Sequence, residues 1–371
     1  MKKVLFLIHD LGAGGAEKVL VNLVNHMDQH RFDITVMALF GGGVNEQFLK
    51  KHIRYQTVFP KTIRGNSHIM KLFSPQLLHR MFIREHYDIE VSYLEGPSAR
   101  VISGCPDQDT KLVSWIHVEQ HTMKNVAKPF RDANEAKWCY NRFDQTICVS
   151  KYVKDDFCGI LDYKKPCRVL YNTLETEEIQ RLAREEALDF IDDGYLRLIA
   201  VGTLKKSKGY ERLLRIVKLL KDTHCLVHLY VLGTGPMESK LKDFILENSM
   251  TDIVTFLGYK VNPYKYVARS DLFVCSSYSE GFSTAATEAL IVGTPVCTVD
   301  VSGMKELLGE KNEFGVVTEN SEMALYQALR YLLSDSSILE HYRKQAQKRG
   351  ESFHTESTVK AVEEMLFSIT E

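Results

Sequence analysis

The feature that most constrains the fold is an alternation of short, continuous apolar runs with amphipathic helical segments along the whole chain. Continuous apolar runs are typical of strands that are buried on both faces of a parallel sheet. Strands that alternate with helices build open parallel sheets. We therefore expect an α/β protein, with strands at residues 4–8, 33–39, 89–94, 111–117, 145–150, 167–172, 196–202, 227–233, 253–258, 272–277, 295–299 and 314–318.

A polar, highly charged helical stretch, TEEIQRLAREEALDF, interrupts the alternation, which then restarts. Two such series in 371 residues match two domains of ordinary size. We predict two doubly wound, Rossmann-like domains, residues 1–175 and 190–354, and a terminal helix within 355–371 that can pack on either domain, including back on the first. Ligands of such sheets bind at the carboxyl ends of the strands, so the expected site is a cleft across which the two domains face each other.

The overall charge excludes a nucleic-acid coat, because 47 Lys and Arg balance 48 Asp and Glu to a net charge of −1. Residues 50–86, however, hold eight Lys or Arg against one acid, a net of +7, so the rest of the chain carries −8. Apolar residues are interleaved with these basic ones. The segment is either a basic amphipathic surface that contacts an anionic membrane or a helix whose basic side is merely solvated.

The start of the chain predicts a cytoplasmic protein. Two lysines and the run VLFLI resemble a secretory signal, but His9 and Asp10 interrupt the run and no cleavage site follows. No stretch approaches the length of about 18 apolar residues that spans a bilayer. The eight cysteines form no C-x-x-C pair, and several lie in strand-like runs, so we expect reduced, mostly buried thiols.

The segment SEGFSTAATEALIVGTPVCTVD, residues 279–300, carries the strongest chemical signal. Ser283 or Thr284 can cap a helix whose free N–H groups and positive dipole suit a phosphate. Glu280 precedes that helix and Glu288 lies about one turn into it; ionised carboxylates can accept two hydrogen bonds from sugar hydroxyls. The spacing alone is equally consistent with a surface loop residue and an early-helix acid favoured by the dipole.

This motif resembles the donor-site motif of glycosyltransferase family 4: two glutamates seven residues apart, Gly-Phe after the first, Glu-Ala-Leu at the second and then Gly-Thr-Pro. The resemblance runs the length of the chain. It includes IHDLGAGGAEKVLVNL, WIHVEQ, ICVSKYVKDDF, VLYNTL, VGTLKKSKGYERLL, VLGTGPMESKL and VTFLGYKVNPYKYVARSDLFVCSS. It implies the GT-B architecture and a retaining transferase that uses a nucleotide sugar.

The resemblance also implies which residues carry the reaction. His117 of WIHVEQ matches the active-site histidine of the family, although a histidine that ends an apolar strand can equally be a core residue. Lys208 of KSKG matches the phosphate lysine, and a fixed cation there would stabilise the leaving diphosphate. Glu280 would bind the hydroxyls of the transferred sugar. The interpretation of KKSK as a solvated loop stays open.

The implied donor contacts come from both domains. Gly14 and Gly15 would let the backbone approach the donor phosphate or the acceptor, and the amides of Ser283 and Thr284 would cradle the diphosphate. Glu288 would bind the ribose hydroxyls. The remaining nucleoside contacts would come from Tyr259, Gly202 and Thr203.

One position departs from the family pattern. Thr203 stands where an arginine usually follows the glycine of this strand, which puts one diphosphate contact in doubt. Lys205 could replace it but lacks the forked geometry of arginine.

We expect no metal and no cofactor, with the nucleotide sugar as a co-substrate. The Asp107-Gln108-Asp109 sequence precedes a strand rather than following one, which favours a surface turn over a metal-binding aspartate pair. We also find no His, Cys and carboxylate cluster with ligand spacing.

Family use makes a UDP-sugar the first hypothesis for the donor and GDP-sugars the second. The acceptor would be a saccharide or a lipid-linked saccharide of a surface polysaccharide or glycolipid. A GT-B phosphorylase or epimerase and a non-catalytic nucleotide-sugar binder are the alternatives.

Overall fold

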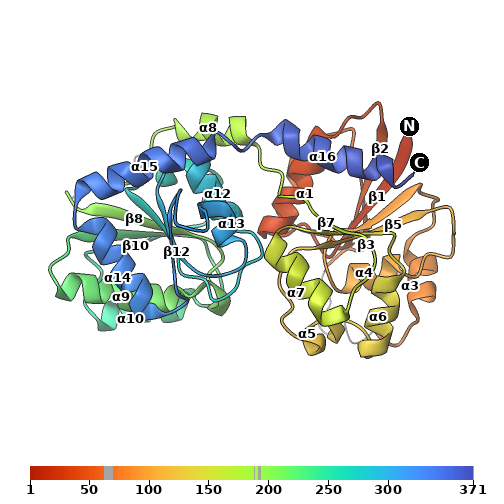
Figure 1. The fold of residues 1–371 in the computed structure, drawn as a ribbon, viewed down its shortest axis with the longest axis horizontal. Coiled ribbons are helices and arrows are strands. Elements are labelled where there is room, and N and C mark those ends of the chain that lie inside the picture. The colour runs from red at the N-terminus through yellow and green to blue at the C-terminus, as the bar shows by residue number, and fades with distance from the viewer. Residues whose placement is uncertain (62–69, 188, 191–193, 371) are drawn as a thin grey trace. The chain divides into compact units, whose positions relative to one another are not determined.

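A computed structural model describes residues 1–61, 70–187, 189–190 and 194–370. The chain forms two compact units. Unit 1 comprises Met1–Thr173 with Glu356–Glu371, and unit 2 comprises Leu174–Thr355. Each unit is a parallel sheet with helices on both sides (Figure 1).

The sheet of unit 1 has seven strands in the order β3-β2-β1-β4-β5-β6-β7, and all neighbouring strands pair in parallel. The strand order reverses direction between β1 and β4, which opens a crevice at the carboxyl ends of these two strands. The strands are β1 (Lys2–Ile8), β2 (Phe32–Phe40), β3 (Arg54–Phe59), β4 (Ile89–Ser92), β5 (Lys111–Ile116), β6 (Gln145–Cys148) and β7 (Cys167–Val169).

The helices of unit 1 cover both faces of this sheet, with α1 and α16 on one side and α4 and α6 on the other (Figure 1). Capping side chains determine where several of these helices begin. At the N-terminus of α7, for example, the Ser150 hydroxyl accepts a hydrogen bond from Val153 N–H at 3.1 Å. The helices are α1 (Gly15–His26), the 3₁₀ turn η1 (Glu46–Phe48), α3 (Pro75–Phe82), α4 (Pro97–Ile102), α5 (Met123–Ala127), α6 (Ala133–Asn141), α7 (Lys151–Leu161) and α16 (Thr355–Ser368).

The sheet of unit 2 has six parallel strands in the order β10-β9-β8-β11-β12-β13. Its order reverses between β8 and β11, which are paired through Leu272↔Leu198 and Phe273↔Ile199. The strands are β8 (Leu196–Val201), β9 (Val227–Leu232), β10 (Val254–Gly258), β11 (Leu272–Cys275), β12 (Val296–Val299) and β13 (Val316–Thr318).

In unit 2, α9, α10 and α14 lie together on one side of the sheet (Figure 1). Buried leucines and valines of α9 and α14 form one core cluster with β8, β9 and β11. The helices are α8 (Thr176–Ala183), the 3₁₀ turn η2 (Lys206–Lys208), α9 (Tyr210–Asp222), α10 (Glu238–Glu247), α11 (Tyr264–Val267), α12 (Thr284–Ile291), α13 (Met304–Leu308), α14 (Glu322–Leu333) and α15 (Ser336–Gly350).

The last helix, α16, packs on unit 1. The ring of Phe367 lies edge-on to Phe32 at 5.5 Å, and the Arg31 guanidinium lies 4.2 Å from the centre of the Phe367 ring. The Glu363 carboxylate accepts a hydrogen bond from Asp28 N–H at 2.6 Å. These contacts lie more than 300 positions apart along the chain, so the chain returns to unit 1 after it completes unit 2.

The fold class expected from the sequence, two Rossmann-like parallel sheets, is confirmed. The sequence treated residues 50–86 as one basic amphipathic stretch, but the structure divides this segment. Residues 54–59 form the edge strand β3, and Pro75–Phe82 form α3; Arg64 lies outside the described residues. β3 is only half-buried, so it lacks the apolar run by which the other strands are identified.

All eight cysteines are free thiols. Among the helices of the described residues, none combines the length and the apolar character that a bilayer crossing requires.

Candidate functional site

Two loops at the carboxyl ends of β8 and β11 bring the strongest candidates together in unit 2. The loop after β8, residues 202–209, ends in η2 and leads into α9; the loop after β11, residues 276–283, leads into α12. β8 and β11 flank the point where the strand order reverses, where open α/β sheets bind their ligands.

Lys208 and Glu280 meet at this edge. The Lys208 Nζ lies 2.6 Å from Glu280 Oε1, and the Ser277 hydroxyl donates a hydrogen bond to the same oxygen at 2.5 Å. The two side chains keep 25% and 10% of their surface exposed, so the pair lies at the floor of a small hollow rather than in the core. Tyr210 and Ser283 also line this hollow. The resemblance predicted both charged residues as site residues, and the structure pairs them.

The start of α12 lies next to this pair. The Ser283 hydroxyl caps the helix by accepting a hydrogen bond from Ala286 N–H at 3.3 Å, and Thr284 is the first helical residue. The first amides of a helix lack intrahelical acceptors and carry the positive end of its dipole. The edge therefore combines a cation, a carboxylate and a helix N-terminus, a set of groups that can bind a diphosphate and polyhydroxylated sugar together.

Glu288 is one turn further along α12. It is buried, and its carboxylate accepts a hydrogen bond from the Tyr264 hydroxyl at 3.2 Å. This contact holds the side chain against α11, so its direction is fixed before any ligand binds.

The remaining predicted nucleoside contacts are spread along the sheet edge. Gly202 follows β8 with φ +153°, and its carbonyl accepts a hydrogen bond from the Tyr210 hydroxyl at 3.1 Å. Thr203 is exposed. Tyr259 is 54% exposed and follows β10, which lies two strands from β8. The structure thus places Gly202 and Thr203 in the same loop as Lys208, and Tyr259 farther along the edge.

In unit 1, His117 lies just past the carboxyl end of β5. It is buried, and its Nε2 is one of the few buried side-chain nitrogens without a hydrogen-bond partner among the residues that the structure describes. Burial lowers the pKa of His117 to about 3, although a backbone hydrogen bond with Tyr93 opposes the shift. A neutral imidazole with one unsatisfied nitrogen can exchange a single hydrogen bond with a ligand.

Sequence reasoning missed Glu95, which follows the neighbouring strand β4. Its carboxylate accepts a hydrogen bond from His117 N–H at 2.9 Å, and the ring of Tyr93 lies 4.9 Å from the His117 ring. Burial raises the pKa of Glu95 to about 6. The one signal in the sequence was an acid directly after a strand-like run.

Gly14 and Gly15 lie at the start of α1, after β1. Gly14 is the N-cap of the helix and Gly15 its first residue. A Cβ atom at Gly14 would meet the Glu17 carboxylate, which would have to turn away to make room. Both glycines lie at the carboxyl edge of the unit 1 sheet, as does His117.

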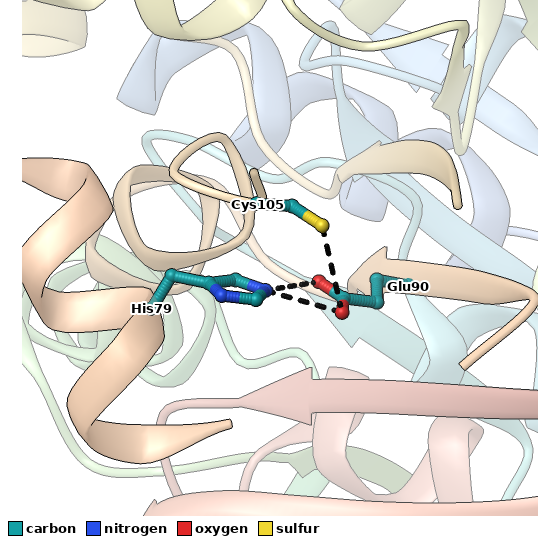
Figure 2. A group of neighbouring side chains, drawn as sticks. All are labelled: His79, Glu90 and Cys105. Carbon is teal, nitrogen blue, oxygen red and sulfur yellow. Dashed lines mark hydrogen bonds and ion pairs between the residues drawn. The ribbon is translucent and has the colours of Figure 1, made fainter. Parts of the chain in front are cut away.

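Two groups of side chains have the composition of metal ligands, although the sequence showed no such cluster by spacing. Figure 2 shows the first, in which His79 of α3, Glu90 of β4 and Cys105 converge in the interior of unit 1. His79 Nε2 lies 2.8 Å from Glu90 Oε2, and the Cys105 thiol approaches Glu90 Oε1 at 3.9 Å. Burial lowers the pKa of His79, but hydrogen bonds with Cys105 and Glu90 outweigh it and raise the pKa to about 9. His79 and Glu90 thus form a buried hydrogen-bonded pair, with the Cys105 thiol beside it.

In the second group, Glu119 and His121 follow β5, and Asp156 lies in α7. Asp156 accepts hydrogen bonds from the backbone N–H groups of Gln120 and His121, at 2.6 and 3.1 Å, so it fixes the turn after His117. The Asp107-Gln108-Asp109 segment is an exposed turn, in which Asp107 pairs with His86 at 2.9 Å.

Two family profiles match consecutive parts of the chain. The one described as Glycosyltransferase Family 4 matches residues 13–178, and the one described as Glycosyl transferases group 1 matches residues 185–349.

Curated relatives match over nearly the full length. The chain is 27% identical to N-acetylgalactosamine-N,N'-diacetylbacillosaminyl-diphospho-undecaprenol 4-alpha-N-acetylgalactosaminyltransferase of Campylobacter jejuni, over 95% of this chain and 96% of the relative. It is 24% identical to the lipopolysaccharide core biosynthesis glycosyltransferase LpsD of Rhizobium meliloti, over 90% and 89%.

Solved structures match the fold. Anabaena HepE in complex with UDP and glucose superposes with a TM-score of 0.77 at 19% identity, over 99% of this chain and all of the other. Sucrose-phosphate synthase of Thermosynechococcus elongatus superposes with a TM-score of 0.82 at 17% identity, over 100% and 99%.

Proposed function

This chain belongs to glycosyltransferase family 4 and has the GT-B fold, and from that premise we propose that it is a retaining transferase of a hexosyl group. The donor is a nucleotide sugar, with a UDP-sugar as the first hypothesis. The acceptor is a saccharide or lipid-linked saccharide in surface polysaccharide or glycolipid assembly.

The observation that carries the proposal is the contact between Lys208 and Glu280 at the switch point of the unit 2 sheet. A leaving diphosphate develops negative charge as the glycosidic bond breaks, and a lysine fixed at that point stabilises it. The Glu280 carboxylate accepts hydrogen bonds from hydroxyls of the transferred sugar and thereby orients its anomeric carbon. A cation and a carboxylate at one sheet edge thus suit the two halves of a sugar diphosphate.

The diphosphate is held without a resident metal ion or cofactor in this proposal. The first amides of α12, beside Ser283 and Thr284, supply hydrogen-bond donors, and Lys208 supplies the positive charge. Glu288 binds the ribose hydroxyls from its fixed position against Tyr264. Gly202, Thr203 and Tyr259 border the nucleoside, and in unit 1 Gly14, Gly15 and His117 provide backbone and imidazole contacts for the reacting groups.

The comparisons support the choice of donor and acceptor. The Campylobacter jejuni relative is named for the transfer of N-acetylgalactosamine to a diphospho-undecaprenol saccharide, and the HepE structure contains UDP. We propose a UDP-N-acetylhexosamine or UDP-hexose as donor and a saccharide on a polyprenyl diphosphate as acceptor. Retention follows from a front-side path, in which the departing phosphate accepts the proton of the acceptor hydroxyl.

A polyprenyl acceptor lies in a membrane, and α3 offers a surface that suits one. Leu77 and Met81 are 43% and 45% exposed on this helix, and Arg80 and Arg84 are exposed beside them. Exposed apolar side chains flanked by arginines are typical of peripheral contact with anionic lipids. We propose that the enzyme works from the cytoplasmic face of the membrane through this helix.

Transfer can be tested directly. UDP- and GDP-sugars are screened by thermal shift, and the donor that stabilises the protein is then incubated with saccharides on polyprenyl diphosphates. We expect UDP release with formation of a product whose anomeric configuration, read by NMR coupling constants, equals that of the donor. Glu280→Gln should abolish transfer, whereas Glu310→Gln, an exposed carboxylate-to-amide change in the same unit, should not. Inversion, or equal transfer by both variants, contradicts the proposal.

Membrane contact is tested by flotation with vesicles containing anionic phospholipid. The double variant Arg80→Glu and Arg84→Glu should remain at the bottom of the gradient. A matched reversal of two exposed lysines on α15, Lys344→Glu and Lys348→Glu, should float like the wild type. Equal flotation of both variants contradicts the proposed surface.

A further inference from the structure

A buried arginine, Arg212, lies directly behind the Lys208–Glu280 pair. It is in the first turn of α9, four residues after Lys208, and is 2% exposed. A fully buried arginine is unusual because arginine keeps its charge and loses its solvation. Its position in the helix YERLLRIVKLLK gives no sequence signal for burial.

The guanidinium of Arg212 binds the loop that carries Glu280. Its Nε donates to the carbonyl of Ser276 and its Nη2 to the carbonyl of Ser277, each at 2.7 Å. Its Nη1 donates to the Asn320 side-chain oxygen at 2.8 Å, and the Tyr278 ring covers its face at 4.3 Å. Two loops, the one after β11 and the one after β13, are thus tied to one side chain of α9.

The same loop is linked to both charged residues of the site. The Ser277 hydroxyl donates to Glu280 Oε1 at 2.5 Å. The backbone carbonyl of the same residue is one of the two that Arg212 holds. The Ser276 hydroxyl donates to the carbonyl of Lys208 at 3.1 Å. A displacement of the loop at residues 276–277 therefore moves Glu280 relative to Lys208.

Arg212 has no carboxylate partner among the residues that the structure describes; its hydrogen-bond acceptors are two backbone carbonyls and an amide oxygen. Hydrogen bonds from a charged donor are roughly twice as strong as neutral ones. The rigid fork can hold two successive carbonyls at once, which a lysine cannot. The side chain is thus built to fix backbone rather than to balance charge.

We propose that Arg212 is a positioning residue that holds the 276–280 loop so that Glu280 faces the donor sugar while Lys208 faces the diphosphate. The inference rests on the proposed function. Arg212 does not touch the donor in this scheme; it acts through Ser276 and Ser277.

Unit 1 contains a matched control. Arg100 is also fully buried and also donates to two backbone carbonyls, those of Met70 and Phe73, at 2.7 and 2.6 Å; unlike Arg212, it also pairs with a carboxylate, that of Glu135, at 2.8 Å. Arg100→Lys removes a comparable fork from a clamp that holds only unit 1 backbone. It therefore measures what the loss of such a clamp does to stability alone.

The experiment compares Arg212→Lys, Arg212→Met and Arg100→Lys in the full chain. Turnover is measured as UDP release at a temperature well below the thermal unfolding midpoint of each variant. Misplacement of a reacting group by about 1 Å can cost about 100-fold, so we expect kcat to fall about 10-fold in Arg212→Lys and about 100-fold in Arg212→Met. Affinity for UMP, which reports the nucleoside contact of Glu288, should stay within about twofold by calorimetry. Arg100→Lys should lower the unfolding midpoint with kcat unchanged.

Ser277→Ala keeps the test decisive if the arginine variants fail to fold, because it deletes only the hydroxyl link to Glu280. We expect Ser277→Ala to lower kcat. Adding Arg212→Lys to this variant should then change kcat very little, since both substitutions act through one loop. Unchanged kcat in Ser277→Ala, or a fall in UMP affinity equal to the fall in kcat in the arginine variants, overturns the proposal.

Failure of the proposed function looks different. In that case the wild type itself neither binds UDP nor releases it, and amide hydrogen exchange of residues 276–283 decides the positioning role. Arg212→Lys should speed exchange there by at least about 10-fold, as expected when a local clamp is lost, while Arg100→Lys should not. Equal protection in both variants overturns the inference.

Discussion

Replacing Glu90 with glutamine tests how α3, the helix with the proposed membrane surface, is held on unit 1. His79 on the inner side of α3 contacts both Glu90 oxygens, at 2.8 and 3.1 Å, and the two residues are 6% and 2% exposed (Figure 2). Glutamine keeps the shape of the side chain and removes its charge. The substitution therefore isolates the ionic part of this contact.

The size of the effect follows from the histidine. The hydrogen bonds with Cys105 and Glu90 outweigh burial and raise the pKa of His79 from 6.5 to about 9. Because one pKa unit is worth 1.36 kcal/mol, the rise corresponds to about 3 kcal/mol. The folded state binds the proton more tightly than the unfolded state does. The stabilisation is therefore complete below about pH 6.5 and is lost as the pH rises through about 9.

The assay is urea unfolding of the wild type and Glu90→Gln at several pH values from about 6 to about 9.5. We expect the difference in free energy of unfolding between the two proteins to shrink by at most about 3 kcal/mol across this range, because Cys105 also contributes to the raised pKa of His79. Glu85→Gln is the matched control, because Glu85 pairs with Arg54 at 2.7 Å in an exposed position where such pairs contribute little.

Two results would refute the reasoning. Parallel stability curves for the wild type and Glu90→Gln would mean that His79 is not held as an imidazolium by Glu90. An equal pH-dependent loss in Glu85→Gln would mean that the pH effect arises from the surface charge of the segment rather than from the buried pair.

Three further outcomes are expected. Because burial holds the pKa of His117 at about 3, the pH profile of kcat should show no imidazole ionisation between about pH 5 and 8. His117→Asn should lower kcat and leave the shape of this pH profile unchanged. A decrease of kcat near pH 6.5 that is present in the wild type and absent from the variant would contradict this. Glu288→Gln should weaken UMP binding about 10-fold by calorimetry through the loss of one charge-assisted hydrogen-bond acceptor, and equal affinity would remove the ribose role. Gly209→Ala should destabilise the protein by at least about 2 kcal/mol in urea, because φ is +66° and a Cβ atom would overlap the Ser276 carbonyl, whereas Gly159→Ala in α7, where a Cβ meets nothing within 4 Å, should stabilise it by about 0.5–1 kcal/mol.

The fold was predictable from the sequence wherever burial leaves a periodic signal. The central strands, such as β1 and β11, are buried on both faces and read as continuous apolar runs. The edge strand β3 was missed because its side chains are half-exposed and include Arg54 and Gln56. Its pairing with β2 depends on backbone hydrogen bonds, which leave no mark on side-chain composition.

The candidate site was predictable only in part. Resemblance to a family identified Lys208 and Glu280, which stand 72 positions apart, but the sequence could not show that Ser277 donates to the same carboxylate oxygen. Arg212 was missed because a charged residue in an amphipathic helix is normally solvated. The His79–Glu90 pair was missed because its partners come from α3 and β4, so their proximity arises from packing rather than from spacing along the chain.

In the proposed donor site, the contacts of Glu280 would let the Lys208–Glu280 pair serve both before and after a donor binds. Without a donor, Lys208 and Glu280 neutralise each other at 2.6 Å. A diphosphate gives Lys208 a second anion, and the lysine can turn to it because its side chain is 25% exposed and flexible. Glu280 cannot follow, because the Ser277 hydroxyl holds the same oxygen and the Arg212 fork holds the backbone of Ser277. The exchange therefore frees a carboxylate whose position is already fixed, and the sugar hydroxyls meet an acceptor that needs no further ordering.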